Sequence, residues 1–220
     1  MDLFPLWNSL RIAFFASIII FFLGIFLAYF VKKCPKIIKA ILDVILMLPL
    51  VLPPTVCGYL LILIFGANHP IGQFLSSIGI FFFMDWKGGI LAASMVAFPL
   101  MYRTARSSFE AFDENLASAA KTLGLSNSYV FWRIRIPNCK NGIIAGCVLS
   151  FARALGEYGA TSMLIGYIPN RTATISTTVA HAWANNDTAT AIIWVVINIV
   201  ISASVLIFVN LIEGKKGENK

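Results

Sequence analysis

The stretch that decides the fold is Ser118-Ala119-Ala120-Lys121-Thr122-Leu123-Gly124, with Ile134-Arg135-Ile136-Pro137 beginning ten residues after the glycine. Small, helix-forming residues are followed by a glycine stop and later by a proline stop. These intervals predict two short polar helices folded into a compact projection, residues 113–137, which we call the knob. Because most of the remaining chain is apolar, we expect the knob to project from a membrane and to meet a partner there.

The composition is that of a membrane protein. Of the 220 residues, 59% are hydrophobic and only 12% are charged, whereas soluble domains carry about 25% charged residues. Several apolar runs reach the roughly 18 to 20 residues that a helix needs to cross a bilayer. Long solid apolar blocks, without the alternation of barrel strands, predict an all-α polytopic membrane protein.

We expect about five transmembrane helices in a single domain that covers residues 1–220. The predicted ranges are 9–31, 40–65, 88–101, 142–166 and 190–212. The third is short and is expected to continue as helix through Tyr102 and Arg103, whose long side chains can reach the interface. The segment 71–84 is too short and too rich in Gly and Ser to cross, so we expect it to lie at the interface or outside.

The basic residues fix the orientation, because cytoplasmic loops of membrane proteins carry an excess of Lys and Arg. The N-terminus is therefore expected outside, the loop of about 105–141 in the cytoplasm, and the C-terminus inside. This distribution accounts for the net charge of +7, so no nucleic-acid partner is expected. The three basic groups are Lys32, Lys33, Lys36 and Lys39; Arg103, Arg106, Lys121, Arg133, Arg135 and Lys140; and Lys215, Lys216 and Lys220.

Capping residues define the two helices of the knob. Asp113 is a good N-cap for a helix through Leu123, and Gly124 can adopt the left-handed conformation that ends it. Ser126 is expected to cap a second helix, which Pro137 ends before the next span. The knob is either a docking surface or an amphipathic connector on the bilayer. The residues predicted to meet a partner are Leu116, Ala119, Ala120, Leu123, Gly124, Val130, Phe131, Ile134 and Pro137.

Two features inside the predicted spans indicate a polar pathway. Arg153 lies about 18 Å along the fourth predicted span, near the middle of the bilayer, and Glu157 is four residues on, where the two can pair on one helix face. A charge at this depth costs about 2.5–3.5 kcal/mol, so the pair either locks the span against its neighbours or lines a pathway at a dimer axis. Prolines in 48–55 predict a kink in the second span, which either lines the pathway or is only structural. The predicted pathway residues are Pro53, Pro54, Thr55, Arg153, Glu157, Tyr158, Thr161 and Ser162.

The knob resembles a loop of a known family. Ala119-Ala120, Gly124 and Ile134-Arg135-Ile136-Pro137 match the EAA loop of ABC-importer permeases, although Ser118 stands where that family usually has glutamate. The segments 48–55, 102–106 and 150–161 look like the molybdate permease branch, which is close to the sulfate permeases. The compact length of the chain favours the molybdate branch.

The resemblance implies a type I ABC-importer permease fold in the cell membrane. It implies a homodimer whose knobs couple to two ABC ATPase subunits, with an external substrate-binding protein that delivers an oxyanion. The expected substrate is molybdate, with tungstate or sulfate as alternatives. The permease itself would hold no cofactor, because ATP and Mg are used by the partner ATPase.

The sequence predicts a transport subunit and not an enzyme. It has no phosphate-binding Gly-x-x-x-x-Gly-Lys-Ser/Thr motif, and no metal motif or nucleophile–base set stands out. A secondary transporter or channel working alone would be expected to show inverted repeats, which the sequence lacks. An intramembrane enzyme is the third alternative.

Overall fold

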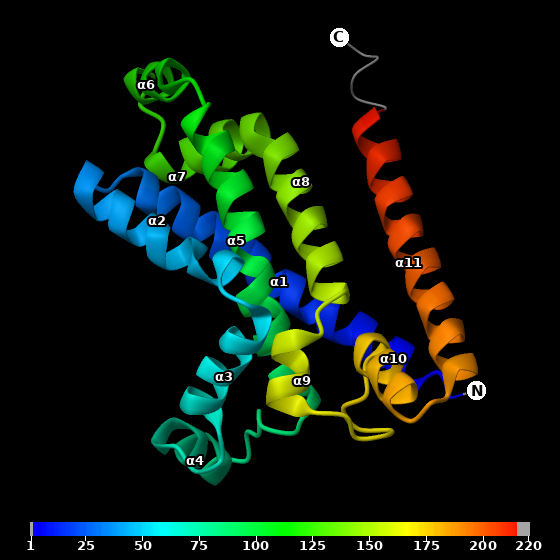
Figure 1. The fold of residues 1–220 in the computed structure, drawn as a ribbon. Coiled ribbons are helices and arrows are strands. Elements are labelled where there is room, and N and C mark those ends of the chain that lie inside the picture. The colour runs from blue at the N-terminus through cyan, green and yellow to red at the C-terminus, as the bar shows by residue number, and fades with distance from the viewer. Residues whose placement is uncertain (1, 215–220) are drawn as a thin grey trace.

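The structure, a computed structural model, describes residues 2–214. In this part of the chain every regular element is a helix (Figure 1). The helices are α1 (Phe4–Lys32), α2 (Lys36–Val51), α3 (Pro54–Phe65), α4 (Pro70–Ser77), α5 (Trp86–Glu110), α6 (Glu114–Thr122), α7 (Asn127–Tyr129), the π-helical η1 (Val130–Arg135), α8 (Ile136–Leu155), α9 (Gly159–Ile165), α10 (Ile175–Ala184) and α11 (Thr188–Gly214).

The helix α5 lies at the centre and packs against α1, α2, α3, α8 and α9. Small residues allow these close approaches, as is usual for membrane helices. A Cβ added at Gly24 of α1 would stand 2.6 Å from Met101 Cγ of α5, and one at Gly146 of α8 would collide with Thr104. By contrast, α11 packs mainly on α10 and is largely exposed.

The first and last predicted spans are confirmed as helices that are long and apolar enough to cross a membrane. The first, α1, has 29 residues and is about 43 Å long at 1.5 Å per residue. The helix α5 continues past Tyr102 and Arg103 to Glu110, as expected. By length and composition, the described residues contain two spanning helices, or up to four if each bent pair is one span. The count of five stays a prediction.

The kink that the prolines predict in the second span is confirmed, whereas the fourth predicted span is wrong as a single helix. The helices α2 and α3 are bent by 111° where Leu52 and Pro53 are extended, because two consecutive prolines remove backbone donors and disfavour helical geometry before them. Pro49, in contrast, remains inside α2. The fourth span breaks after Leu155, and α8 and α9 meet at 55°.

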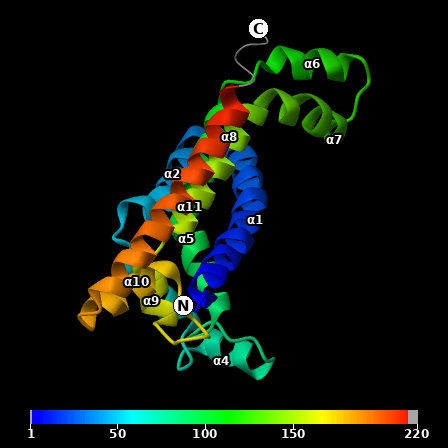
Figure 2. The ribbon, with the colours of Figure 1, turned by 90° about the vertical axis from the view of Figure 1, so that its right-hand side faces the viewer.

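The two ends of the molecule differ in character. The helices α6 and α7 lie at one end, together with the C-terminal end of α11, while α4, α10 and the start of α1 lie at the other (Figures 1 and 2). The segment 71–84 forms most of the short α4 and a loop, so it does not span the bundle, as expected. The basic turn after α1 lies at the α6 end, because Lys32 pairs with Glu114. The third basic group lies outside the described residues.

Candidate functional site

The knob comprises residues 113–137. Its first helix, α6, begins and ends where the sequence predicts. The Asp113 carboxylate accepts a hydrogen bond from the Asn115 N–H at 2.9 Å, which satisfies a free donor at the start of α6. Gly124 follows the helix with φ +81°, a conformation that glycine adopts without strain. Ser126 then accepts a hydrogen bond from the Tyr129 N–H at 3.2 Å and caps α7.

The second helix does not end at Pro137. It runs from Asn127 through the π-helical turn η1 into α8 and reaches Leu155. A wider turn just before a proline relieves the clash of the ring with the preceding carbonyls. Pro137 therefore lies inside a continuous helix, at the first turn of α8, and the second helix of the knob runs on into α8.

The predicted docking residues divide into two groups. Leu116, Ala119, Leu123, Gly124 and Pro137 are exposed, and Leu123 is 80% exposed. The others face the chain itself, in whole or in part: Ala120 and Val130 are buried, Ile134 is half-buried, and Phe131 packs 4.6 Å from the Tyr29 ring. Ala120, which the helical spacing predicts on one face with Leu116, Ala119 and Leu123, instead packs inward, so the prediction is wrong for this residue. Coupling to a partner stays a prediction for these residues.

An ion-pair junction braces the knob. The Glu114 carboxylate receives two hydrogen bonds from the Arg135 guanidinium, at 2.7 and 2.8 Å, and one from Lys32 Nζ at 2.5 Å. The bonds from Arg135, and then those from Lys32, lower the pKa of Glu114 to about 2 against the opposing effect of burial. Sequence reasoning missed this junction, since Lys32 and Glu114 are 82 positions apart and carry no shared local signal.

The two helix breaks meet inside the bundle. A Cβ added at Gly159 would stand 2.8 Å from Pro54 Cβ, and one at Gly58 would stand 2.7 Å from Met163 Cβ. Thus α3 and α9, the segments beyond each break, pack closely. Pro54 and Tyr158, two of the predicted pathway residues, are 104 positions apart in the sequence. The structure brings their surroundings together, because Gly159 packs against Pro54.

Arg153 and Glu157 form the expected ion pair, with 2.7 Å between Arg153 Nη1 and Glu157 Oε2. They do not share one continuous helix, because α8 ends at Leu155 and the pair bridges the break. Glu157 is only 4% exposed, and its other oxygen accepts a hydrogen bond from the Ala160 N–H at 2.8 Å. The carboxylate therefore also binds the first turn of α9.

The remaining predicted pathway residues differ in access. Tyr158 is exposed and Thr55 lies at the start of α3, whereas Thr161 is buried within the packed interior. The Ser162 hydroxyl donates a hydrogen bond to the Gly159 carbonyl at 3.1 Å. In the part of the chain that the structure describes, no group of three or more His, Cys, Asp or Glu residues is arranged to hold a metal ion.

These features define a helical membrane protein with a capped knob at one end and broken helices in its interior. The family model described as "Binding-protein-dependent transport system inner membrane component" matches residues 20–217. The chain belongs to this family, and it is a multi-pass permease of the ABC-importer class located in the membrane. Its fold is that of type I ABC-importer permeases.

Curated relatives cover most of the chain. The molybdenum transport system permease protein ModB of Escherichia coli K12 is 44% identical over 176 residues, 78% of this chain and 77% of that protein. A putative molybdenum permease, YvgM of Bacillus subtilis, is 38% identical over 93% of this chain and 91% of its own length. The sulfate permease CysW of Synechococcus elongatus is 32% identical over 81% of this chain and 63% of its own.

A solved structure has the same fold. The crystal structure of a bacterial ABC transporter that imports the acidic polysaccharide alginate aligns with a TM-score of 0.77 and 18% identity. The alignment covers 97% of this chain and 79% of that one. At this identity the likeness concerns the fold alone.

Proposed function

We propose that the chain is the membrane subunit of an ATP-driven importer for molybdate. The observation that carries the proposal is the knob: two capped helices, the first with exposed Leu116 and Ala119 and with exposed Leu123 at its end, and the second continuous with α8. Such a surface suits docking to a motor subunit. ATP and Mg would be bound and used by that partner, and this chain would hold no cofactor and perform no catalysis.

The substrate assignment rests on the relatives. The two molybdenum permeases are 44% and 38% identical to the chain, and the sulfate permease is 32% identical. All three names refer to transport of tetrahedral oxyanions or their metal. Molybdate is therefore the first candidate, with tungstate and sulfate as the alternatives to be compared in one assay.

The working unit would be a homodimer with two ATPase subunits and an external binding protein. Two copies around a two-fold axis can enclose a pathway that one helical bundle cannot. The knob and the basic turn after α1 lie at one end of the molecule (Figure 2), which supports a cytoplasmic loop of about 105–141 and an outside N-terminus. The binding protein would then deliver the anion at the end that carries α4 and α10.

The mechanism would be a two-state switch biased at a remote site. Closure of the ATPase subunits on ATP would bring the two knobs together. Because each knob is continuous with α8, the movement would reach the break at Gly156 and the neighbouring break at Pro53. Arg153, neutralised by Glu157, would offer an anion a passing contact and not a deep well, as conduction requires.

The test is uptake by proteoliposomes. The chain, co-expressed with its ATPase and supplied with its binding protein, should accumulate labelled molybdate only when ATP is present on the knob side. Competition with tungstate and sulfate ranks the substrates. Accumulation of oxyanion by the chain alone, without an ATPase, would show a stand-alone secondary transporter and overturn the proposal.

A further inference from the structure

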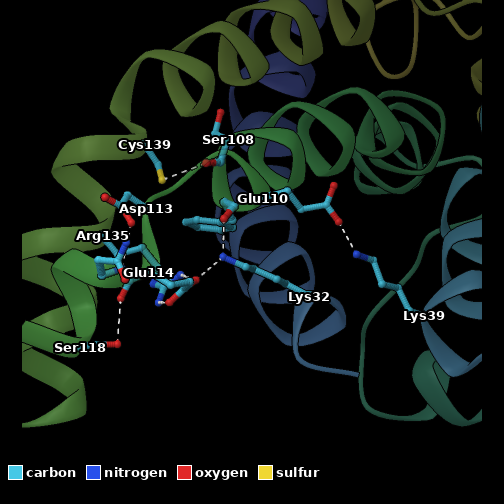
Figure 3. Close-up of polar contacts among 11 residues, drawn as sticks. Lys32, Lys39, Ser108, Glu110, Asp113, Glu114, Ser118, Arg135 and Cys139 are labelled. Atoms are coloured by element: carbon cyan, nitrogen blue, oxygen red, sulfur yellow. Dashed lines mark hydrogen bonds and ion pairs between the residues drawn. The ribbon is translucent and has the colours of Figure 1, made fainter. Parts of the chain in front are cut away.

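Two carboxylates flank the corner at which α5 turns into α6. Glu110 is the last residue of α5, and Glu114 is the first residue of α6. In Figure 3 basic side chains reach these carboxylates from other helices, Lys39 toward Glu110 and Lys32 toward Glu114. The corner is therefore tied to its neighbours on both sides.

The Glu114 junction joins three elements. Lys32 comes from the end of α1 and Arg135 from the end of η1, next to the start of α8. Arg135 is only 7% exposed, and its guanidinium lies 4.5 Å from the centre of the Phe112 ring. Its two parallel bonds to one carboxylate fix the direction of α6 as well as its position.

The Glu110 junction joins α5 to α2. Lys39 of α2 pairs with Glu110, and Arg106 of α5 pairs both with Glu110 and with Asp43 of α2. Arg106 also donates a hydrogen bond to the Tyr102 hydroxyl at 2.8 Å. The helix α2 ends at the break before Pro53, so charged contacts link the corner to the helix that leads to that break.

These junctions are suited to fixing geometry more than to adding stability. The Glu114 and Glu110 side chains are 54% and 42% exposed, although the Arg135 side chain is only 9% exposed, so solvent screens part of the energy of these pairs. Yet the partners of the two carboxylates come from α1, α2, α5 and η1. A displacement of the knob would pull on all of these elements at once.

We propose that Glu114 and Glu110 are positioning residues that transmit movement of the knob to α1, α8 and α2. The proposal rests on the proposed function, in which an ATPase subunit moves the knob. Neither residue contacts the substrate. Their task is to keep the knob and the membrane helices moving as one body, so that hydrolysis in the partner is converted into opening of the pathway.

The test is the number of oxyanions transported per ATP hydrolysed by the complete complex in proteoliposomes. In Glu114→Gln the complex should assemble and hydrolyse ATP, while this ratio falls by about 2- to 30-fold, the range for residues of a coupling network. Glu114→Asp, which keeps the charge, should recover part of the ratio. A loss of stability alone would lower both rates together and leave the ratio unchanged.

The matched control is Lys36→Gln, since Lys36 is exposed and makes no ion pair among the described residues. This variant should keep the wild-type ratio of oxyanions transported per ATP hydrolysed. Lys32→Gln and Lys39→Gln should lower that ratio. If Glu114→Gln does not assemble, these two milder variants decide the question. A wild-type ratio in both lysine variants, or in an assembled Glu114→Gln complex, overturns the inference. Failure of the proposed function is distinct, because the wild-type complex would then show no ATP-driven uptake.

Discussion

At the scale of single residues, the two charged sites differ in what surrounds them. Arg153 and Glu157 bridge the break between α8 and α9, which we expect to lie within the membrane, and Glu157 is almost completely buried. Glu114 lies at the end of the bundle, half exposed, with two cations on it. Removing one partner therefore has different consequences at the two sites, and each can be tested separately.

At the membrane site, Glu157→Gln should impair assembly. Glutamine keeps an oxygen that can accept the Ala160 N–H, but it leaves the Arg153 charge unpaired, at a cost of up to about 3 kcal/mol. Arg153→Ala should likewise disrupt either assembly or transport. The double variant Arg153→Met, Glu157→Gln removes both charges of the pair and leaves no unpaired charge. It should therefore assemble better than Glu157→Gln alone, as measured by the yield of monodisperse complex.

Uptake by that double variant separates the two interpretations of the pair. Normal assembly with lost uptake would favour a role in lining the pathway, whereas normal uptake would favour a purely structural lock. If Arg153→Ala assembles and takes up oxyanion like wild type, both interpretations are wrong.

At the knob, the stability contributed by Glu114 should depend on pH in a defined direction. Its pKa is lowered to about 2 from an ordinary value of 4.5, so the folded state favours the ionised carboxylate. The contribution is therefore fully present above about pH 4.5 and is lost as the pH falls toward about 2. The difference in melting temperature between wild type and Glu114→Gln in detergent should be largest near neutral pH and should shrink below pH 4.5. High salt should also reduce this difference in melting temperature, because it screens the ion pairs. A difference that grows on acidification would contradict the proposed stabilising contacts of Glu114.

At the scale of elements, local signals predict what short segments do, and tertiary contacts decide the rest. The caps at Asp113 and Ser126 and the turn at Gly124 were predictable because each depends on a few consecutive residues. Pro137 was misjudged, since a proline preceded by a π-helical turn can be accommodated inside a continuous helix. The prolines at 53 and 54 signalled a kink, but the size of the bend depends on how α3 packs against α9.

The same distinction explains what sequence reasoning missed at the site. The Arg153–Glu157 pair was predictable because its members are four residues apart. The Glu114 junction was not, because it requires α1 and η1 to converge on the start of α6. Likewise, helical spacing placed Ala120 with Leu116 and Leu123, but only the tertiary structure shows that Ala120 packs inward.

The turn between α6 and α7 gives a prediction at this scale. Gly124 has φ +81° with nothing within 4 Å of an added Cβ, so Gly124→Ala should destabilise the knob through backbone strain alone, by about 1–2 kcal/mol. Hydrogen exchange of α6 should become faster, and binding of the ATPase should weaken. Gly124→Asn should have a smaller effect, because asparagine tolerates this conformation better.

The chain offers a matched control for this substitution. Gly79 has φ +78° and is equally unobstructed, but it follows α4 at the opposite end of the molecule. Gly79→Ala should therefore leave hydrogen exchange in α6 and binding of the ATPase unchanged. Equal effects of the two substitutions on ATPase binding would argue against a special role for the knob.

At the scale of the whole molecule, the fold separates a polar, basic end from an end with few charges. Ion pairs at the first end connect α1, α2, α5, α6 and η1. Near the other end, the outer halves of the broken helices pack together through Gly58 and Gly159. An importer driven from the cytoplasm needs this division, since force must enter at one end and the pathway must open toward the other.

Sidedness is the property on which the proposed function depends, and it can be measured directly. In a background with Cys34, Cys57, Cys139 and Cys147 replaced by serine, Ser77→Cys places a thiol on the exposed face of α4, and Leu123→Cys places one on the knob. A membrane-impermeant maleimide should label the first in intact cells and the second only after permeabilisation. Binding of the ATPase should then slow labelling at position 123 and leave position 77 unaffected, because only the knob would be covered. Labelling of position 123 in intact cells would place the knob outside, where no ATP-driven subunit could reach it, and the coupling mechanism would have to be abandoned.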